Sequence, residues 1–296
     1  MTILAATAQT ARSAIQKRMK PLLGDMGATY IRFSYALPFA WLWVISYGGF
    51  SGHDVPQVTT SFWGWVSFAA MMQVVFTIFL IKMFSHRSFA AGTAFSKTEV
   101  LQAAIFEALI LGVVVSFITG IAIFLGVIAV VMLSLAQASL SRHQLHAALF
   151  SRQTLLGLMS GATLGLATVC FKAAVLAVDS DDWLMAAAYT GAIAVTLQTV
   201  VMGSWMALSS HRNQLKATLL NWRSSLFAGL FGAVATAAWF TAFALYAVAP
   251  VRAVGQVELL ITIGVSIFYF REKTNKAELL AIILLLLSIV MIVIDT

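Results

Sequence analysis

The chain has few charged residues, and this scarcity restricts its class more than any other property. Of its 296 residues only 10% are charged, whereas 61% are hydrophobic and the mean hydropathy is +0.93. A soluble domain carries about 25% charged residues, so this chain has too few to cover a soluble surface. The composition therefore excludes a soluble globular protein and predicts that lipid replaces the missing polar surface.

Proline and cysteine are also scarce, and each shortage excludes a further class. Only four prolines occur, and the apolar runs extend over about 20 residues, the length that spans a bilayer as a helix. A membrane β-barrel would show short segments of alternating hydrophobicity instead. The single cysteine, Cys170, excludes an intramolecular disulfide and a multi-cysteine metal site. The sequence also has no phosphate-binding Gly-x-x-x-x-Gly-Lys-Ser/Thr loop and no catalytic constellation, so we expect neither an enzyme nor a cofactor.

Apolar runs between polar breaks predict an all-α polytopic membrane protein with about ten transmembrane helices. The first run is ambiguous, because it contains Arg12 and is followed by Lys17 and Arg18; it is either a span or a short cytoplasmic arm. The predicted spans are 2–20, 33–49, 61–84, 88–112, 117–137, 154–177, 184–208, 225–247, 250–270 and 277–294.

Basic residues concentrate on alternate connections between these spans. The basic connections hold Lys17, Arg18, Lys20, Arg87, Arg142, Arg152, Arg212, Lys216, Arg223, Arg271, Lys273 and Lys276. The opposite connections hold Asp54, Asp179, Asp181 and Asp182, with Arg252 as an exception. Because cytoplasmic loops are enriched in Lys and Arg, the first set should face the cytoplasm. With ten spans both termini would then lie on the other side, and with nine the N-terminus would lie inside. The net charge of +7 therefore does not indicate a nucleic-acid partner.

An internal repeat relates the two halves of the chain. Residues 94–101 align with residues 253–260, which places Glu99 over Glu258, and Arg12 aligns with Lys172 in the opening segments. We predict a first five-helix repeat at 1–138, a connecting loop at 139–153 and a second five-helix repeat at 154–296. Repeats with an odd number of spans are inverted relative to each other, and inverted repeats build transporters around a site near the midplane.

Two acidic residues inside the apolar runs are the leading candidates for a functional site. Glu99 and Glu258 occupy matched repeat positions, and a charge near the bilayer centre costs about 2.5–3.5 kcal/mol unless it faces a cavity or a partner. Their candidate partners are the basic residues Lys97, Lys172 and Arg12. The alternative is that these groups form purely structural ion pairs.

Three further residues complete the candidate set. Gln102 lies three residues after Glu99 and shares its helix face, and Gln256 takes the place in the second half that Lys97 has in the first. Trp239 either stacks on a substrate or packs between helices.

Several features resemble the drug/metabolite transporter superfamily, EamA type. They are the five-plus-five plan, the Ile31-Arg32-Phe33 start of the second span, and the Phe270-Arg271-Glu272-Lys273 end of the ninth. Two features depart from the family: Gly112 is not followed by the usual Glu, and the opening helix is unusually polar. Family members also usually keep both termini in the cytoplasm, whereas the charge bias here predicts the reverse. The resemblance implies secondary transport of small metabolites, often proton-linked, without an ATP site.

The expected function is secondary active transport of a small polar or amphipathic metabolite by alternating access. Acids and bases together favour an amino-acid-like zwitterion, with Glu258 as the proton carrier because it lacks the lysine that precedes Glu99 by two residues. The expected partners are this substrate and membrane lipid, and the expected location is a bacterial cytoplasmic membrane. The alternatives are a lipid-handling protein, such as a scramblase or flippase, and a structural membrane subunit.

Overall fold

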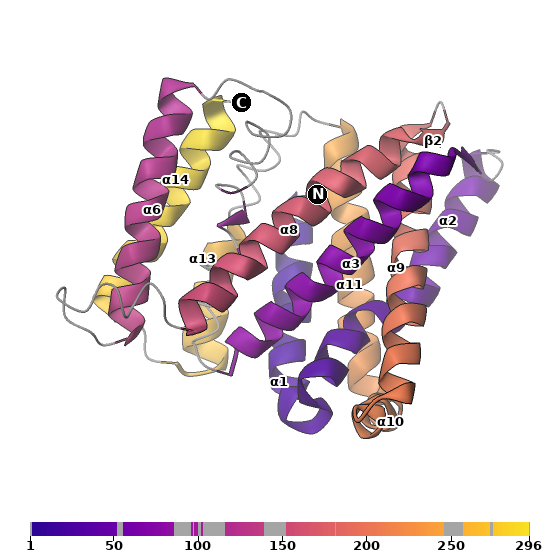
Figure 1. The fold of residues 1–296 in the computed structure, drawn as a ribbon, viewed down its shortest axis with the longest axis horizontal. Helices are drawn as coiled ribbons and strands as arrows, with labels where there is room; N and C mark the ends of the chain where they lie inside the picture. The colour runs from indigo at the N-terminus through magenta and orange to yellow at the C-terminus, as the bar shows by residue number, and fades with distance from the viewer. Residues whose placement is uncertain are drawn as a thin grey trace.

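The fold is a set of long helices, seen in a computed structural model (Figure 1). The described residues are 2–51, 56–85, 96, 98–99, 102, 116–138, 152–180, 182–245, 257–272 and 275–295. The helices are α1 Thr2–Ser34, α2 Leu37–Ser51, α3 Thr60–Met83, α6 Phe117–Ala138, α8 Arg152–Leu176, α9 Trp183–Leu208, α10 Arg212–Leu220, α11 Trp222–Leu245, α13 Val257–Gly264, the π-helix η2 Val265–Tyr269 and α14 Lys276–Asp295. The strands β1 Gln57–Val58 and β2 Val178–Asp179 pair antiparallel.

Most predicted spans coincide with helices where the structure describes them, although α2 begins at Leu37 rather than at residue 33 and α10 lies in a predicted connection. The run 61–84 forms α3, and 184–208 forms α9. The ambiguous first run is helical as well, and its helix extends to a break at Gly24, where φ is 69°. We call residues 2–23 the first arm of α1 and residues 25–34 its second arm. Most of the predicted span 88–112, the connecting loop after residue 138, and Pro250 lie outside the described residues.

The surface of the fold is apolar and its interior contains charged side chains, the reverse of a soluble protein. Leu208, Leu220 and Phe268 are all highly exposed, whereas Arg12 and Glu258 are buried. Three helical segments in the described part of the chain, Thr60–Met83, Thr154–Leu176 and Trp183–Leu208, are long and apolar enough to cross a membrane. A helix suits this setting because it satisfies its own backbone hydrogen bonds, which lipid cannot do.

Helices from the two halves of the chain pack against each other in pairs. The first arm and second arm of α1 contact α11, and α3 contacts α8. In the same way α2 contacts α9, and α6 contacts α14 at one side of the molecule (Figure 1). The chain halves are therefore interleaved rather than separate.

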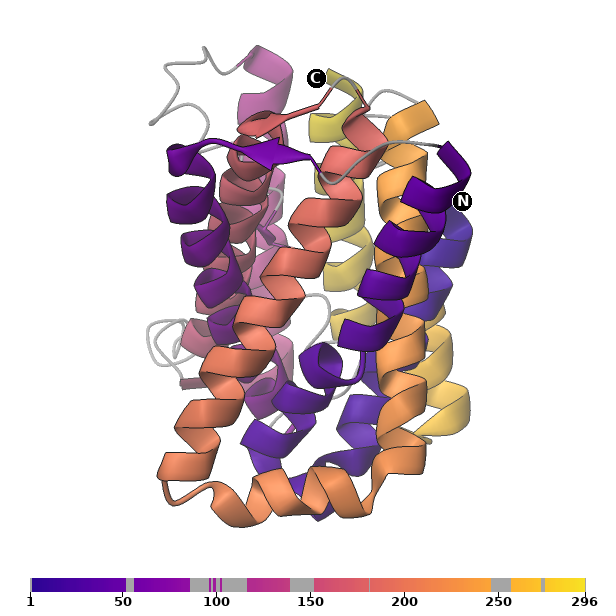
Figure 2. The same cartoon turned by 90° about the vertical axis from the view of Figure 1, so that its right-hand side faces the viewer.

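The two ends of the helix bundle differ in charge. One end holds the β1–β2 ribbon, which includes Asp179, with Asp182 close behind it in the chain. The opposite end holds α10, the break at Gly24 and the ends of α3 and η2 (Figure 2). The α10 end gathers the described basic residues of the connections, Lys17, Arg18, Lys20, Arg152, Arg212, Lys216, Arg223, Arg271 and Lys276.

Candidate functional site

The first arm of α1 presents a polar face to the interior of the bundle. Gln9, Arg12 and Gln16 follow one another at spacings of three and four residues, which places them on one helix face. Arg12 is only 5% exposed, and the Gln16 side chain donates a hydrogen bond of 2.8 Å to the Ala28 carbonyl oxygen in the second arm. The polarity that made this segment ambiguous in the sequence therefore belongs to an interior helix rather than to a solvated arm.

Glu258 contacts this face from α13. It is only 3% exposed, and both of its carboxylate oxygens accept a hydrogen bond of 2.9 Å from Gln9 Nε2. The charge of Glu258 also attracts Arg12 and Arg32. Arg12 was one of the candidate partners named from the sequence, whereas the hydrogen-bond donor Gln9 was not a candidate.

Arg32, on the second arm of α1, brings a second guanidinium group to the same region. It donates a hydrogen bond of 3.0 Å to Thr77 Oγ1 on α3. Its guanidinium carbon lies 5.5 Å from the centre of the Phe76 ring and 5.6 Å from that of Phe33. Arg12 and Arg32 repel each other, while Glu258 attracts both. We call Gln9, Arg12, Arg32, Thr77 and Glu258 the interior cluster.

Helix α11 packs closely against this cluster at a glycine. A Cβ atom at Gly232 would lie 3.3 Å from Arg12 Cδ and 3.8 Å from the Arg32 carbonyl oxygen. The absence of a side chain at Gly232 therefore allows the stem of Arg12 to pass directly beside α11. Trp239, for which the sequence left stacking on a substrate and packing between helices open, is half-buried further along α11.

The acid of the first half lies beside α8. Gln102 donates hydrogen bonds of 3.1 Å to Thr98 Oγ1 and to the Leu158 carbonyl oxygen. A Cβ atom at Gly161 would lie 2.4 Å from Thr98 Oγ1 and 3.1 Å from the Glu99 backbone nitrogen. Gly161 is thus the point at which α8 closely approaches the segment that holds the half-buried Glu99.

The remaining candidates from the sequence are placed only in part. Lys97 and Gln256 lie outside the described residues. The backbone of Lys172 lies near the end of α8, beside the β ribbon, whereas Arg12 lies midway along the first arm of α1. The two residues therefore occupy different depths although the repeat aligns them.

The structure also adds residues that the sequence did not single out. Gln9 could have been found from its position three residues before Arg12, on the same face. Arg32 was noticed only as part of a family motif, yet it is a charge beside an apolar run. Thr77 had no distinguishing signal in the sequence.

A second group of charges, at the α10 end, joins α1 to the segment after η2. Lys17 forms an ion pair with Glu272, and its Nζ atom lies 4.5 Å from the centre of the Phe270 ring. Arg18 donates a hydrogen bond of 2.7 Å to the Tyr269 hydroxyl. Arg271, whose φ is 54°, reverses the chain so that the Glu272 backbone nitrogen donates to the Ser266 carbonyl oxygen at 3.0 Å.

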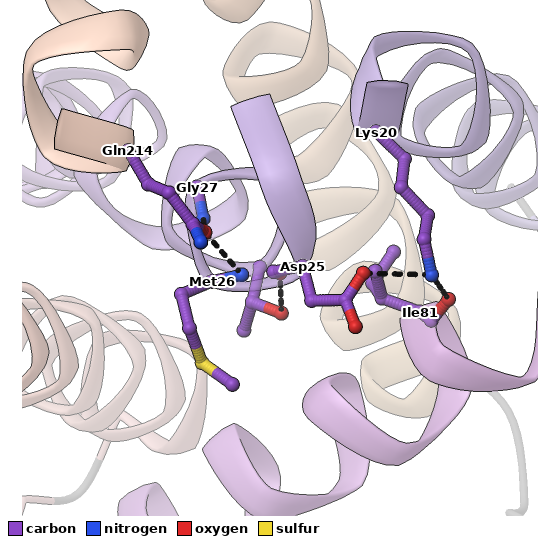
Figure 3. A network of polar contacts seen from close by, with 7 residues as sticks. Lys20, Asp25, Met26, Gly27, Ile81 and Gln214 are labelled. Atoms are coloured by element: carbon purple, nitrogen blue, oxygen red, sulfur yellow. Dashed lines mark hydrogen bonds and ion pairs between the residues drawn. The ribbon is translucent and has the colours of Figure 1, made fainter. Parts of the chain in front are cut away.

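The break in α1 belongs to the same end of the molecule (Figure 3). Lys20 forms an ion pair of 2.8 Å with Asp25 and donates a hydrogen bond of 2.7 Å to the Ile81 carbonyl oxygen on α3. Gln214 on α10 accepts hydrogen bonds from the Met26 and Gly27 backbone nitrogens at 3.0 and 3.2 Å. We call the ion pairs Lys17–Glu272 and Lys20–Asp25, with the hydrogen bonds around them, the end cluster.

Two other features bear on the interior. Gln198 on α9 donates hydrogen bonds to Gln73 Oε1 at 2.8 Å and to the Ala70 carbonyl oxygen at 3.1 Å, so these glutamines join α9 to α3. An apolar cavity of about 270 Å³ lies between α2, α9 and α11. Its lining includes Ala36, Phe39, Trp43, Gly191, Ala233 and Ala237.

Comparison with known proteins adds one finding. Residues 152–294 match the EamA-like transporter family, a stretch that runs from the start of α8 almost to the end of α14. No curated protein matches the chain. The matched family consists of polytopic membrane transporters rather than enzymes.

Proposed function

We propose that this integral membrane protein, whose residues 152–294 are an EamA-like transporter domain of the drug/metabolite transporter superfamily, is a proton-coupled secondary active transporter. It moves a small polar or amphipathic metabolite, of which an amino-acid-like zwitterion is favoured, across a bacterial cytoplasmic membrane by alternating access. The observation that carries the proposal is the interior cluster, in which α1 and α3 of the first half meet α13 of the second. Charged residues within membrane helices typically mark a substrate or ion pathway.

The pairing of helices supports the proposal of about ten spans in two inverted repeats. In chain order α1, α2, α3 and α6 of the first half correspond to α8, α9, α11 and α14 of the second. The first helix of each half contacts the third of the other, as α1 with α11 and α3 with α8. The corresponding helices α2 and α9 contact each other, as do α6 and α14. This reciprocal exchange is the pattern that a pseudo-two-fold axis produces.

The proposed roles follow from the position of each acid. Glu258 would accept and release the coupling proton: beside Arg12 and Arg32 it is held ionised, so it would take up the proton when another negative charge takes its place next to these arginines. Glu99, with Gln102 beside it and Lys97 and Lys172 as its proposed cationic partners, would contact the substrate from the α8 side. Gln256 and Trp239 would line the pathway from the second half.

The test uses the purified full-length chain in liposomes that enclose a pH-sensitive dye. A mixture of amino acids and organic acids is added outside, and proton movement is recorded together with exchange of labelled substrate. Wild type should move protons only when substrate is present. Glu258→Gln should lose the dependence on pH and retain substrate exchange, and Glu99→Gln should lose both activities while remaining monodisperse.

The matched control is Glu278→Gln, which removes a buried acid at the start of α14 and should behave as wild type. Substrate-dependent proton movement that is absent from wild type, or that persists in Glu258→Gln, would contradict the proposal. Fluorescent lipid is included in the same liposomes. Movement of that lipid between leaflets without any metabolite transport would favour the lipid-handling alternative.

A further inference from the structure

The interior cluster contains more positive than negative charge. Arg12 and Arg32 each carry a guanidinium group, which stays protonated in proteins. Within the described part of the chain, Glu258 is the acid whose charge acts on both of them. One carboxylate therefore serves two guanidinium groups, and a bilayer interior offers no water to stabilise the remaining charge.

Other acids described in the structure have partners elsewhere. Asp25 pairs with Lys20, and Glu272 pairs with Lys17, both at the α10 end. Asp182, at the opposite end, accepts hydrogen bonds from the Tyr47 hydroxyl and from the Leu184 backbone nitrogen. These three acids are therefore not placed to balance the second arginine.

Arg12 has the geometry of a binding group. Its Nε atom is buried and has no hydrogen-bond partner among the described residues, although the side chain is only 5% exposed. Its stem is held beside Gly232 on α11. Arg32 is held independently by Thr77 and by the rings of Phe33 and Phe76. Both groups are thus oriented before any ligand arrives, which lowers the entropy lost on binding.

We propose that Arg12 binds the carboxylate group of the transported substrate, and that Arg32 adds the second positive charge that makes the site selective for anionic and zwitterionic compounds. A planar guanidinium group matches a carboxylate through paired hydrogen bonds, which an ammonium group cannot reproduce. The inference rests on the proposed function and names its substrate class. Amines and amides of the same shape bring no negative charge, so the site rejects them.

The test measures binding rather than transport. The purified full-length chain in detergent is heated with each of three carboxylates of increasing apolar size, which are acetate, hexanoate and phenylalanine. Each is compared with its amide. The series extends to an aromatic body because the lining of the apolar cavity includes Ala36, four residues after Arg32 in the turn between α1 and α2. A ligand that binds the folded state raises the Tm, and the rise grows with the logarithm of the ratio of ligand concentration to Kd.

The expected result is a concentration-dependent rise in Tm with at least one carboxylate and none with its amide. Arg12→Gln should weaken that binding by about tenfold or more, the usual value of a hydrogen bond to a charged group. Arg12→Lys should bind with intermediate affinity, because it keeps the charge and loses the paired geometry. Arg223→Gln, which removes an exposed arginine at the start of α11, is the control and should bind as wild type does.

Two results would overturn the inference. One is that no carboxylate raises the Tm more than its amide does. That result would be expected if a further acid of the chain, such as Glu99, already balanced the charge of Arg32. The other is that Arg12→Gln, or Arg12→Lys if the first variant does not fold, binds the carboxylate as tightly as wild type. Proton-coupled transport without a preference for carboxylates would contradict this inference and leave the proposed function standing. Carboxylate binding without any transport would instead contradict the proposed function.

Discussion

The interior cluster and the end cluster both contain buried or half-buried charges, yet they are balanced differently. In the end cluster each lysine has its own acid, as in Lys17–Glu272 and Lys20–Asp25. In the interior cluster Arg12 and Arg32 share Glu258. Balanced pairs can close one end of a bundle by themselves, whereas a shared acid leaves a charge that a ligand can satisfy. The difference separates a structural contact from a proposed binding site.

Exposure reinforces this difference. The Glu272 and Asp25 side chains are 23% and 35% exposed, whereas Glu258 is 3% exposed as a residue. Charges near water are partly stabilised by the solvent, so losing one partner costs little. Charges removed from water depend on their protein partners alone. The two clusters should therefore respond differently to the same substitutions.

The largest expected effect concerns the side of the membrane on which the end cluster lies. The basic connections predict that the α10 end faces the cytoplasm. With Cys170 replaced by Ala, Ser210→Cys beside α10 should resist an impermeant thiol reagent in intact cells, and Gln57→Cys on the β ribbon should react fully; both positions are exposed. Labelling is read by gel shift. The opposite pattern would place the end cluster outside and restore the usual topology of the family.

Neutralising one acid in each cluster should destabilise the protein by different amounts. Glu258→Gln leaves both arginines without their acid, and the loss of one partner of a buried ion pair costs about 3–5 kcal/mol. Glu272→Gln breaks a partly exposed pair and should cost about 1 kcal/mol or less. Unfolding of each variant in mild detergent is followed by intrinsic fluorescence. Equal losses of stability would show that the interior cluster is no more dependent on its acid than the end cluster is.

A side chain added at the break in α1 should destabilise the protein more than one added at Gly232. Gly24 has φ 69° and ψ 179°, a conformation that costs a residue with a side chain about 1–3 kcal/mol. A Cβ there would also lie 2.5 Å from Gln214 Cδ. Gly24→Ala should therefore destabilise the protein, and adding Gln214→Ala should restore only part of the loss. A Cβ at Gly232 would press only on the flexible stem of Arg12, since the Arg32 carbonyl oxygen lies at an ordinary contact distance of 3.8 Å. Gly232→Ala should therefore cost less, as thermal unfolding of wild type and the three variants can determine.

The smallest expected effect is a dependence on salt. The Debye length falls from about 10 Å at 0.1 M salt to about 3 Å at 1 M. Lys20→Gln should cost about 0.5 kcal/mol at low salt, and this cost should shrink at 1 M because the pair with Asp25 is partly exposed. The cost of Glu258→Gln should not change with salt. The free energy of unfolding of both variants is measured across a salt series. If the destabilisation by Glu258→Gln fell with salt as that by Lys20→Gln does, the proposed difference between the two clusters would be contradicted.

Much of the architecture was predictable because a chain that spans lipid must do so as apolar helices of about 20 residues. Apolar runs such as 117–137 and 277–294 correspond to α6 and α14 within one residue at each end. Glu258 was also recognisable as a candidate, because a charge within an apolar run is costly unless it faces a cavity or a partner. In contrast, the break at Gly24 was not predicted, since a glycine between a basic segment and an apolar one is compatible with a continuous helix.

The sequence by itself determined the class of the protein, the position of most of its long apolar helices in the described part of the chain, and the alternation of basic connections. Those properties depend on local hydropathy, which a single chain carries along its length. Only the tertiary structure decided that Gln9 binds Glu258 across 249 positions of sequence and that Arg32 joins Arg12 beside the same acid. Such contacts depend on how α1 packs between α3, α11 and α13. The pairing of helices is set by the shape of small and large side chains at each interface, which hydropathy does not record.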